Sequence, residues 1–325
     1  MTTAHTLGTL GEQAVLARIF PRLPHAASAI IGPGDDAAVL ATPDGRTVVT
    51  TDMMVHGPDF RLAWSSPYDL GWKAAATNLA DVAAMGAAPT ALVVALAVPV
   101  DTPVDALERF ADGLRDACDA LAPSCGVVGG DLSVTDTMTI AVTAFGDLAG
   151  AAPVLRSGAR PGDVVAVAGD LALAAAGIRL LFAEAVDAHG MPDADAAARL
   201  AERHPEELRA QLRPSPPITL GVVAARAGAT AMLDVSDGLA LDARRIARAS
   251  GVALDLRLAD VGSPEALEGG EAHALLATFP PEGALPEGFR PIGLVVEGES
   301  VLVDGEPYAR LGGWDPYADW NGARG

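Results

Sequence analysis

Cysteine and long apolar runs are both scarce in this chain of 325 residues. Its cysteines, Cys118 and Cys125, are too few and too close together for a disulfide framework or a zinc site, so we expect buried or partly buried thiols. The longest apolar run, from Ala91 to Val100, has ten residues, whereas a membrane-spanning helix needs about 20. Residues 1–5 contain neither a basic region nor an apolar core, so no secretory signal is visible and we expect a cytoplasmic protein.

Positive charge is the other shortage. Lys73 is the only lysine, and 22 lysines and arginines together face 42 aspartates and glutamates, which gives a net charge of −20. This charge repels nucleic-acid backbones and anionic lipids, so it argues against nucleic acid or a membrane surface as a partner. An anionic substrate would need metal ions to relieve the same repulsion.

Length and composition predict two globular domains. The chain is 50% hydrophobic and 20% charged, as is typical of folded proteins, and it is longer than the roughly 250–300 residues at which single cores stop growing. We place the boundary near residues 150–153, which gives domains of residues 1–150 and 151–325. Helices and strands are mixed in both blocks, so the expected fold class is α+β.

Local patterns predict the elements within each block. In the first, helices are expected at 12–20, 67–86 and 102–121, with Ser66 as the N-cap of the second, and a buried strand at 91–98. Strands at about 37–41 and 47–52 are expected to pair as a hairpin, and 129–131 to form a turn between strands. The second block alternates strands at 164–168, 231–234, 252–256, 292–296 and 300–303 with helices at 172–186, 193–212, 218–227 and 239–249.

Aspartates recur beside glycine or hydroxyl residues, in segments 34–36, 50–52, 78–81, 129–131 and 234–238. Carboxylates in this pattern are typical ligands of divalent cations, which in turn hold a polyphosphate. Each segment also has a structural interpretation when it is taken alone. Asp35 and Asp36 suit a solvated turn, and Ser236 or Asp237 suits a helix cap.

The expected helix at 67–86 carries a single polar stripe. Lys73, Thr77 and Asp81 recur every four residues, with Asn78 alongside, while the rest of the helix is strongly apolar. The stripe is either a solvated ladder of lysine and aspartate or a functional face on which Asp81 is directed at a metal ion. In the second case Asn78 and Lys73 support the site.

Glycines and an arginine complete the pattern expected of a phosphate site. Gly129 and Gly130 allow backbone N–H groups to approach a phosphate closely, and Arg156 follows the expected domain boundary. The chain has no Walker-type phosphate loop, no dinucleotide-binding glycine fingerprint and no protein-kinase signature. A bound nucleotide is therefore held by another architecture, and the six histidines show no metal-ligand spacing.

Together these segments resemble the thiamine-monophosphate kinases, a family of the aminoimidazole-ribonucleotide-synthetase superfamily, over nearly the whole chain. The matching segments are 34–39, 50–52, 69–74, 78–87, 128–131, 155–163, 234–238, 269–271 and 313–315. The resemblance implies transfer of the ATP γ-phosphoryl group to thiamine monophosphate, giving thiamine diphosphate, with several Mg²⁺ ions. It also implies a homodimer in which the N-terminal domains form a β-barrel, and a C-terminal α/β sandwich-like domain that closes the active-site cleft.

The resemblance assigns residues to each ligand. Metal ligands would be Asp36, Thr50, Thr51, Asp52, Asp81, Asp131, Asp234 and Asp237. ATP would contact Gly130, Asp131, Arg156 and Ser236, and the thiamine substrate would contact Asp59, Glu271 and Trp314. No general base is expected, because the nucleophile is a phosphate oxygen that is largely ionised at pH 7, given a second pKa of about 6.

Two residues depart from the family pattern, and both lie toward the thiamine side. Asp59 stands where the family usually has a histidine, with His56 three residues earlier, and Ala272 stands where it usually has an aspartate. We expect these changes to affect substrate affinity more than phosphoryl transfer. The alternatives are another ATP-using enzyme of the superfamily or a non-catalytic regulator that binds nucleotide or thiamine. The positions of the two cysteines speak against superfamily members with a reactive cysteine near either terminus.

Overall fold

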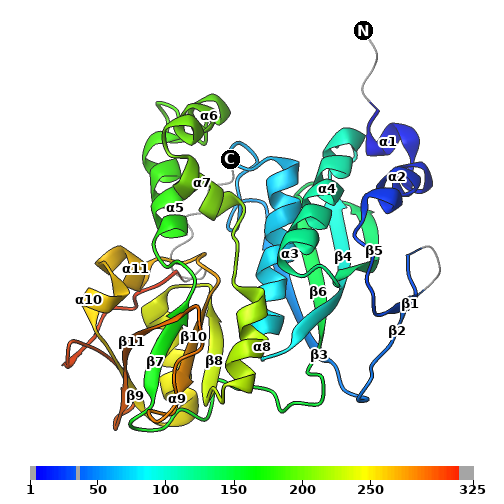
Figure 1. Cartoon of the computed structure of the whole chain (residues 1–325). Coiled ribbons are helices and arrows are strands. Elements are labelled where there is room, and N and C mark those ends of the chain that lie inside the picture. Colours follow the sequence, from blue (N-terminus) through cyan, green and yellow to red (C-terminus); the bar gives the residue numbers. More distant parts are fainter. Residues whose placement is uncertain (1–4, 34–36, 315–325) are drawn as a thin grey trace.

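The computed structural model describes residues 5–33 and 37–314, and these form two halves that each contain one large sheet (Figure 1). The N-terminal half contains helices α1 (Leu7–Leu10), α2 (Glu12–Ile19), α3 (Pro67–Ala84) and α4 (Val104–Leu121) and the short 3-10 turn Phe20–Arg22. Its strands are β1 (Ala29–Ile31), β2 (Val39–Leu40), β3 (Val48–Val55), β4 (Ala88–Val98), β5 (Gly126–Val134) and β6 (Thr139–Asp147). Within the described residues, no helix combines the length and apolar character that crossing a bilayer requires.

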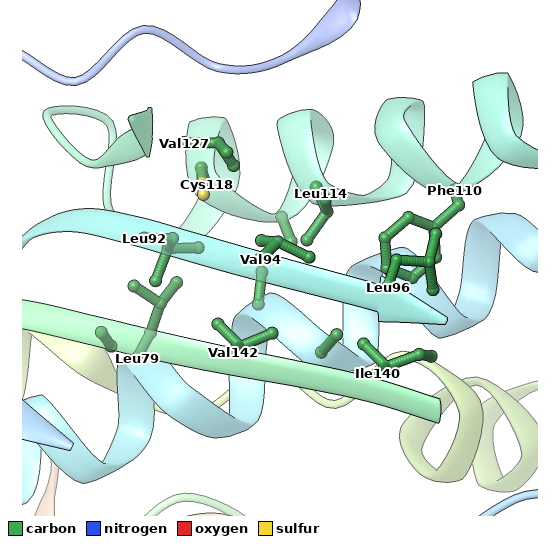
Figure 2. Close-up of a cluster of buried hydrophobic side chains, with 14 of the residues drawn as sticks. Leu79, Leu92, Val94, Leu96, Phe110, Leu114, Cys118, Val127, Ile140 and Val142 are labelled. Carbon is green, nitrogen blue, oxygen red and sulfur yellow. The ribbon is translucent and has the colours of Figure 1, made fainter. Parts of the chain in front are cut away.

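The N-terminal sheet has four strands in the order β3-β6-β4-β5, with only the β4–β5 pair parallel. Helices α3 and α4 pack on one face of it. Figure 2 shows the resulting core, in which Leu92 and Val94 of β4 lie between Leu114 of α4 and Leu79 of α3. Both cysteines are buried in this region, as expected.

Helix α3 begins where the sequence predicts. Ser66 accepts a hydrogen bond from the Asp69 N–H, and the Asp69 side chain accepts one from the Ser66 N–H, which completes a capping box. Most of the helix is buried, including the polar residues Lys73, Thr77 and Asn78. A solvated lysine–aspartate ladder is therefore excluded, because Lys73 is only 6% exposed.

Two expectations for the N-terminal half are wrong. Strand β2 pairs with β1 rather than with β3, and β3 pairs with β6, so no hairpin joins the segments on either side of residues 43–45. Gly129, Gly130 and Asp131 do not form a turn but lie within β5. The parallel β4–β5 pair shifts its register near Val128, and this irregularity lets one strand continue through the glycines.

The C-terminal half contains a seven-stranded sheet in the order β13-β12-β9-β11-β7-β10-β8. Its strands are β7 (Val164–Ala168), β8 (Ala231–Val235), β9 (Ala253–Leu256), β10 (Ala274–Phe279), β11 (Phe289–Val296), β12 (Val301–Val303) and β13 (Glu306–Pro307). Its helices are α5 (Leu173–Glu184), α6 (Ala194–Arg203), α7 (Pro205–Leu212), α8 (Ile218–Arg226), α9 (Leu239–Ser250), α10 (Leu258–Val261) and α11 (Pro264–Glu268). The helix expected at 193–212 is broken before Pro205, whose ring cannot continue the helix interior.

The two halves meet along α3. Helix α8 crosses α3 at Gly221, where an added Cβ would lie 2.1 Å from the Ala83 carbonyl oxygen. Indole N–H groups tie the halves together further along, since Trp72 donates to the Pro214 oxygen at 2.7 Å and Trp64 donates to the Ala185 oxygen at 2.8 Å. These contacts hold α3 against the C-terminal half, where it lies beside α8 and β8 (Figure 1).

Candidate functional site

Carboxylates gather where β3, α3 and β8 meet. The Thr50 hydroxyl donates to Asp81 Oδ2 at 3.1 Å, and Asp52 faces the same side because strand side chains alternate. Burial, and then the carboxylates of Asp234 and Asp52, raise the pKa of Asp81 to about 7. Desolvation, and then Asp234, likewise raise the pKa of Asp52. These acids repel one another, so a cation bound among them would relieve the repulsion.

The surrounding atoms fit a hard divalent cation. Asn78, one turn before Asp81, is 2% exposed, and its Nδ2 donates to the Ala74 oxygen at 3.0 Å. Its Oδ1 therefore faces the other way and has no hydrogen-bond partner among the described residues. Amide and carboxylate oxygens are the donors that Mg²⁺ prefers.

The site is nevertheless not a closed metal cage. In residues 5–33 and 37–314, no three histidine, cysteine, aspartate or glutamate side chains stand close enough to hold a metal ion. Mg²⁺ usually keeps several waters and uses one or two carboxylates together with substrate phosphates. The residues therefore fit Mg²⁺ that is held jointly with a phosphorylated ligand.

Two other expected metal ligands, Thr51 and Asp237, have partners within the protein. The Thr51 side chain is on the opposite face of β3, where its hydroxyl donates to the Val142 oxygen at 3.0 Å and accepts from Thr143 at 3.2 Å, so strand alternation separates it from Thr50 and Asp52. Asp237 is ion-paired with Arg245. Asp36 lies outside the described residues.

Gly130 and Asp131 border a separate cavity of about 600 Å³. Its walls come from α2, α4, β4 and β5 and are largely apolar, with side chains such as Leu16, Leu107 and Phe110. An added Cβ at Gly130 would lie 2.0 Å from the Val94 oxygen, so only glycine fits β5 this closely against β4. The cavity has the volume and polarity of a small-molecule site with one polar edge.

Three loops of the C-terminal half converge near Asp234. The backbone N–H groups of Glu271 and Trp314 donate to the oxygens of Ser236 and Asp237 at 2.6 and 2.9 Å. Gly238, at φ 135°, lies at the centre, since an added Cβ would approach the Glu268 oxygen to 2.7 Å and the Gly312 oxygen to 2.9 Å. The residues expected to bind ATP and thiamine therefore include three, Ser236, Glu271 and Trp314, that lie on adjacent loops.

Asp59 reaches this region from the N-terminal half, whereas the backbone of Arg156 lies beside the start of β8 and the end of α9. Asp59 Oδ2 accepts from the Val55 N–H at 2.6 Å, and its pKa is raised by burial first, with a further contribution from Glu271. Arg156 is exposed on the connection between the two sheets, where its carbonyl oxygen accepts from Ser250 at 3.1 Å.

His273 belongs to the site but was not singled out by sequence patterns. Its Nδ1 lies 3.4 Å from Asp234 Oδ2, and its Nε2 lies 3.9 Å from Glu271 Oε2, which is also 2.5 Å from Lys73 Nζ. Burial alone would lower the pKa of His273, but the carboxylates of Asp234 and Glu271 raise it to about 9. Burial alone would raise the pKa of Glu271, but Lys73 and His273 lower it to about 2. The available signal was a histidine at the head of an apolar segment, two residues after Glu271.

Comparisons with known proteins agree with this architecture. Residues 34–148 match the family model "AIR synthase related protein, N-terminal domain". The chain is 43% identical to thiamine-monophosphate kinase of Mycobacterium tuberculosis strain H37Rv, over 98% of this chain and 95% of that one. Among solved structures, thiamine-monophosphate kinase from Stenotrophomonas maltophilia K279a superposes with a TM-score of 0.73 at 30% identity, covering 91% of this chain and 96% of that one. AaThiL complexed with AMPPCP and TMP gives 0.70 at 31% identity, covering 96% and 99%.

The fold is therefore that of the AIR-synthase-related proteins, with mixed helices and strands. The chain belongs to the thiamine-monophosphate kinase family.

Proposed function

We propose that this protein transfers the γ-phosphoryl group of ATP to thiamine monophosphate, producing thiamine diphosphate and ADP. The observation that carries the proposal is the meeting of Thr50, Asp81 and Asp234 from both halves at one crowded acidic site. The solved complex of AaThiL, which holds AMPPCP and TMP, supports a site with room for a nucleotide and a second phosphorylated ligand. We place the reaction in the cytoplasm, where ATP and Mg²⁺ are both available.

In this mechanism the protein's residues hold and align charge rather than move protons. The acceptor phosphate is already ionised at pH 7, because its second pKa is about 6, so no side chain is needed as a general base. Asp52, Asp81 and Asp234 would hold Mg²⁺, with oxygen atoms of Thr50 and Asn78 beside them. Bound Mg²⁺ would supply the positive charge that allows two anionic phosphates to approach and that stabilises the transferring group.

The remaining metal assignments follow from the family resemblance. Asp36, Thr51, Asp131 and Asp237 would complete the set, with Thr51 limited to its backbone oxygen because its hydroxyl faces the other side of the sheet. Titration of the metal-free protein with Mg²⁺ would give the number of ions bound.

We propose the cavity beside Gly130 as the nucleotide pocket. Its apolar walls suit a flat aromatic base, and Gly130 and Asp131 at its edge would approach the phosphates. The family resemblance also assigns Arg156 and Ser236 to the phosphates, and an arginine guanidinium matches phosphate geometry.

The thiamine side of the site would involve Asp59, Glu271 and Trp314. Trp314 is 39% exposed, which leaves an indole face available for stacking against a ring. Glu271 and Asp59 carry carboxylates toward the same region, as a cationic thiazolium ring requires.

We further propose that the N-terminal domain, residues 1–150, binds ATP and Mg²⁺ and forms a homodimer, and that residues 151–325 close the cleft. In the described residues β3 and β5 are the two edges of an open four-stranded sheet. Val49 and Met53 on the outer face of β3 are 60% and 62% exposed, as is typical of a surface that another chain covers.

Pairing β3 of one copy with β5 of another would close two such sheets into a barrel. Within one chain, Asp131 is separated from Asp52 by strands β6 and β4. Three strand spacings of about 4.8 Å put their backbones about 14 Å apart. A β5 strand from a second copy, placed along β3, would bring an Asp131 much closer to Asp52.

One assay tests the activity directly. Purified protein is incubated with ATP, MgCl₂ and thiamine monophosphate, and thiamine diphosphate and ADP are followed together. Equal amounts of both products support the kinase. Bound ATP with no thiamine diphosphate under saturating conditions would favour a non-catalytic regulator instead.

A further inference from the structure

We propose that His273 is a positioning residue that fixes the Asp234 carboxylate for metal binding, and that the Lys73–Glu271 ion pair anchors His273 from the other half. The inference deepens the proposed function and rests on it, because it takes Asp234 to be a metal ligand.

The imidazole of His273 lies between two carboxylates. Nδ1 is 3.4 Å from Asp234 Oδ2, and Nε2 is 3.9 Å from Glu271 Oε2. His273 and Asp234 are each 6% exposed, so water has little access to either. Among the described residues, His273 is the only side chain recorded within hydrogen-bond or ion-pair distance of the Asp234 carboxylate. The orientation of this carboxylate therefore depends on His273.

The backbone is shaped to present both Glu271 and His273. Both residues adopt left-handed conformations, at φ 67° and 48°, which residues other than glycine rarely adopt. Their N–H groups donate to the oxygens of Ser236 and Val235 at 2.6 and 2.7 Å, directly after Asp234 in the chain. Ala272, between them, lines a separate cavity of about 420 Å³ together with Gly169 and Arg213. The loop thus turns Glu271 and His273 to the metal side and Ala272 to the other.

Lys73 connects this loop to the N-terminal half. Its ammonium group lies 2.5 Å from Glu271 Oε2, and its side chain is 7% exposed. Lys73 and Asp81 lie on one face of α3, eight residues apart, so the same helix supplies a candidate metal ligand and the anchor of the loop. Three consecutive contacts link α3 to β8 and thereby set the distance between them. They join Lys73 to Glu271, Glu271 to His273, and His273 to Asp234. Removing Glu271 would leave the buried ammonium group of Lys73 without this carboxylate, which is destabilising.

Two substitutions of His273 distinguish its contact with Asp234 from its contact with Glu271. The amide nitrogen of asparagine can occupy the place of Nδ1, whereas that of glutamine occupies the place of Nε2. His273→Asn therefore keeps a donor for Asp234, and His273→Gln keeps one for Glu271 only. Asparagine also tolerates the left-handed backbone, so thermal melting of each variant must accompany the binding measurement.

Mn²⁺ binding to the protein without nucleotide, followed by electron paramagnetic resonance, is the measurement. His273→Gln is expected to weaken Mn²⁺ binding at least about tenfold, as loss of groups that orient metal ligands typically does. His273→Asn is expected to stay within about threefold of the wild type. His204→Gln is the matched control. Among the described residues His204 has an ion-pair contact only with Glu207 in its own turn, at 3.6 Å, so this variant should bind Mn²⁺ as the wild type does.

Lys73→Met tests the anchor through a double-mutant cycle. Lys73→Met alone should weaken Mn²⁺ binding, and it should have little further effect in the His273→Gln background, because both act on the same carboxylate. Wild-type affinity in His273→Gln, or equal losses in the Asn and Gln variants, would overturn the proposal. A wild type that binds Mn²⁺ but forms no thiamine diphosphate refutes the proposed function instead, and a wild type that binds no Mn²⁺ refutes both.

Discussion

The hydroxyl of Thr50 donates a 3.1 Å hydrogen bond to the carboxylate of Asp81. This bond joins β3, an edge strand, to α3, a helix that is otherwise almost entirely apolar and buried. It keeps an acidic side chain near other acids although burial, and then the carboxylates of Asp234 and Asp52, raise its pKa to about 7. A cluster maintained at that cost is expected to bind a cation.

Asp81→Asn should reduce thiamine diphosphate formation by at least about a hundredfold, which is typical when one group that stabilises transition-state charge is lost. It should also raise the melting temperature of the metal-free protein, because it removes one of the mutually repelling carboxylates. Asp136→Asn is a suitable control, since Asp136 is exposed between β5 and β6. Near-normal turnover of Asp81→Asn would reject a metal-binding role for this residue.

The metal-free protein should lose stability as the pH rises. Folding raises the pKa of Asp81 from 3.8 to about 7, so the folded state holds the extra proton between those values and the free energy of unfolding falls across that range. His273, raised from 6.5 to about 9, continues the fall at higher pH. Urea midpoints in EDTA should therefore be lower at about pH 8.5 than at about pH 5.5. Mg²⁺ should recover part of the difference by binding the folded state, and equal midpoints would contradict the assigned shifts.

Gly130→Ala should destabilise the protein by about 1–3 kcal/mol, the usual range for overpacking a tight site. The new methyl group would start 2.0 Å from the Val94 oxygen, so β4 and β5 must separate. Gly129→Ala is the matched control, because an added Cβ there meets no atom within 4 Å. Urea denaturation of both variants should show a loss only for the first, and equal losses would mean that glycine flexibility, not strand spacing, matters here.

Met53→Asp should convert a dimer into monomers. Met53 is 62% exposed on the outer face of β3, where a second copy would cover it, and burying a charge in that interface is costly. Light scattering at matched protein concentration gives the mass. Met191→Asp, at a methionine that is 47% exposed in the C-terminal half, should leave the mass unchanged. A wild-type protein that is already monomeric would remove the basis for the barrel.

Most helices and strands could be predicted from regular local patterns in the sequence. Ser66 capped α3 as predicted because its capping box lies within four residues. Strand β10 was not anticipated, since its sequence from Ala274 to Phe279 is rich in alanine and leucine, and every residue in it is buried. A strand buried on both faces has no alternation to detect. The prediction of a hairpin before β3 was wrong, because turn residues do not specify which strands pair.

Local sequence patterns predicted only some residues of the candidate site. Asp52, Asp81 and Asp234 stood in recurring local contexts, and the structure brings them close enough to affect one another's protonation. His273 had no such context, because its partner Asp234 is 39 residues away and lies across the β8–β10 pair. Thr50 and Thr51 stand in the same segment before Asp52, so the sequence did not distinguish them. The pleat of β3 directs their side chains to opposite faces of the sheet.

The single lysine has one more consequence. A protease that cuts only after lysine has one target bond in the entire chain, between Lys73 and Ala74, inside a buried helix that joins the two halves. The folded molecule hides that bond, so two fragments appear only when α3 has locally opened. The rate of this one cleavage would report directly on how often the two halves part, and on whether ATP, Mg²⁺ or thiamine monophosphate keeps them together.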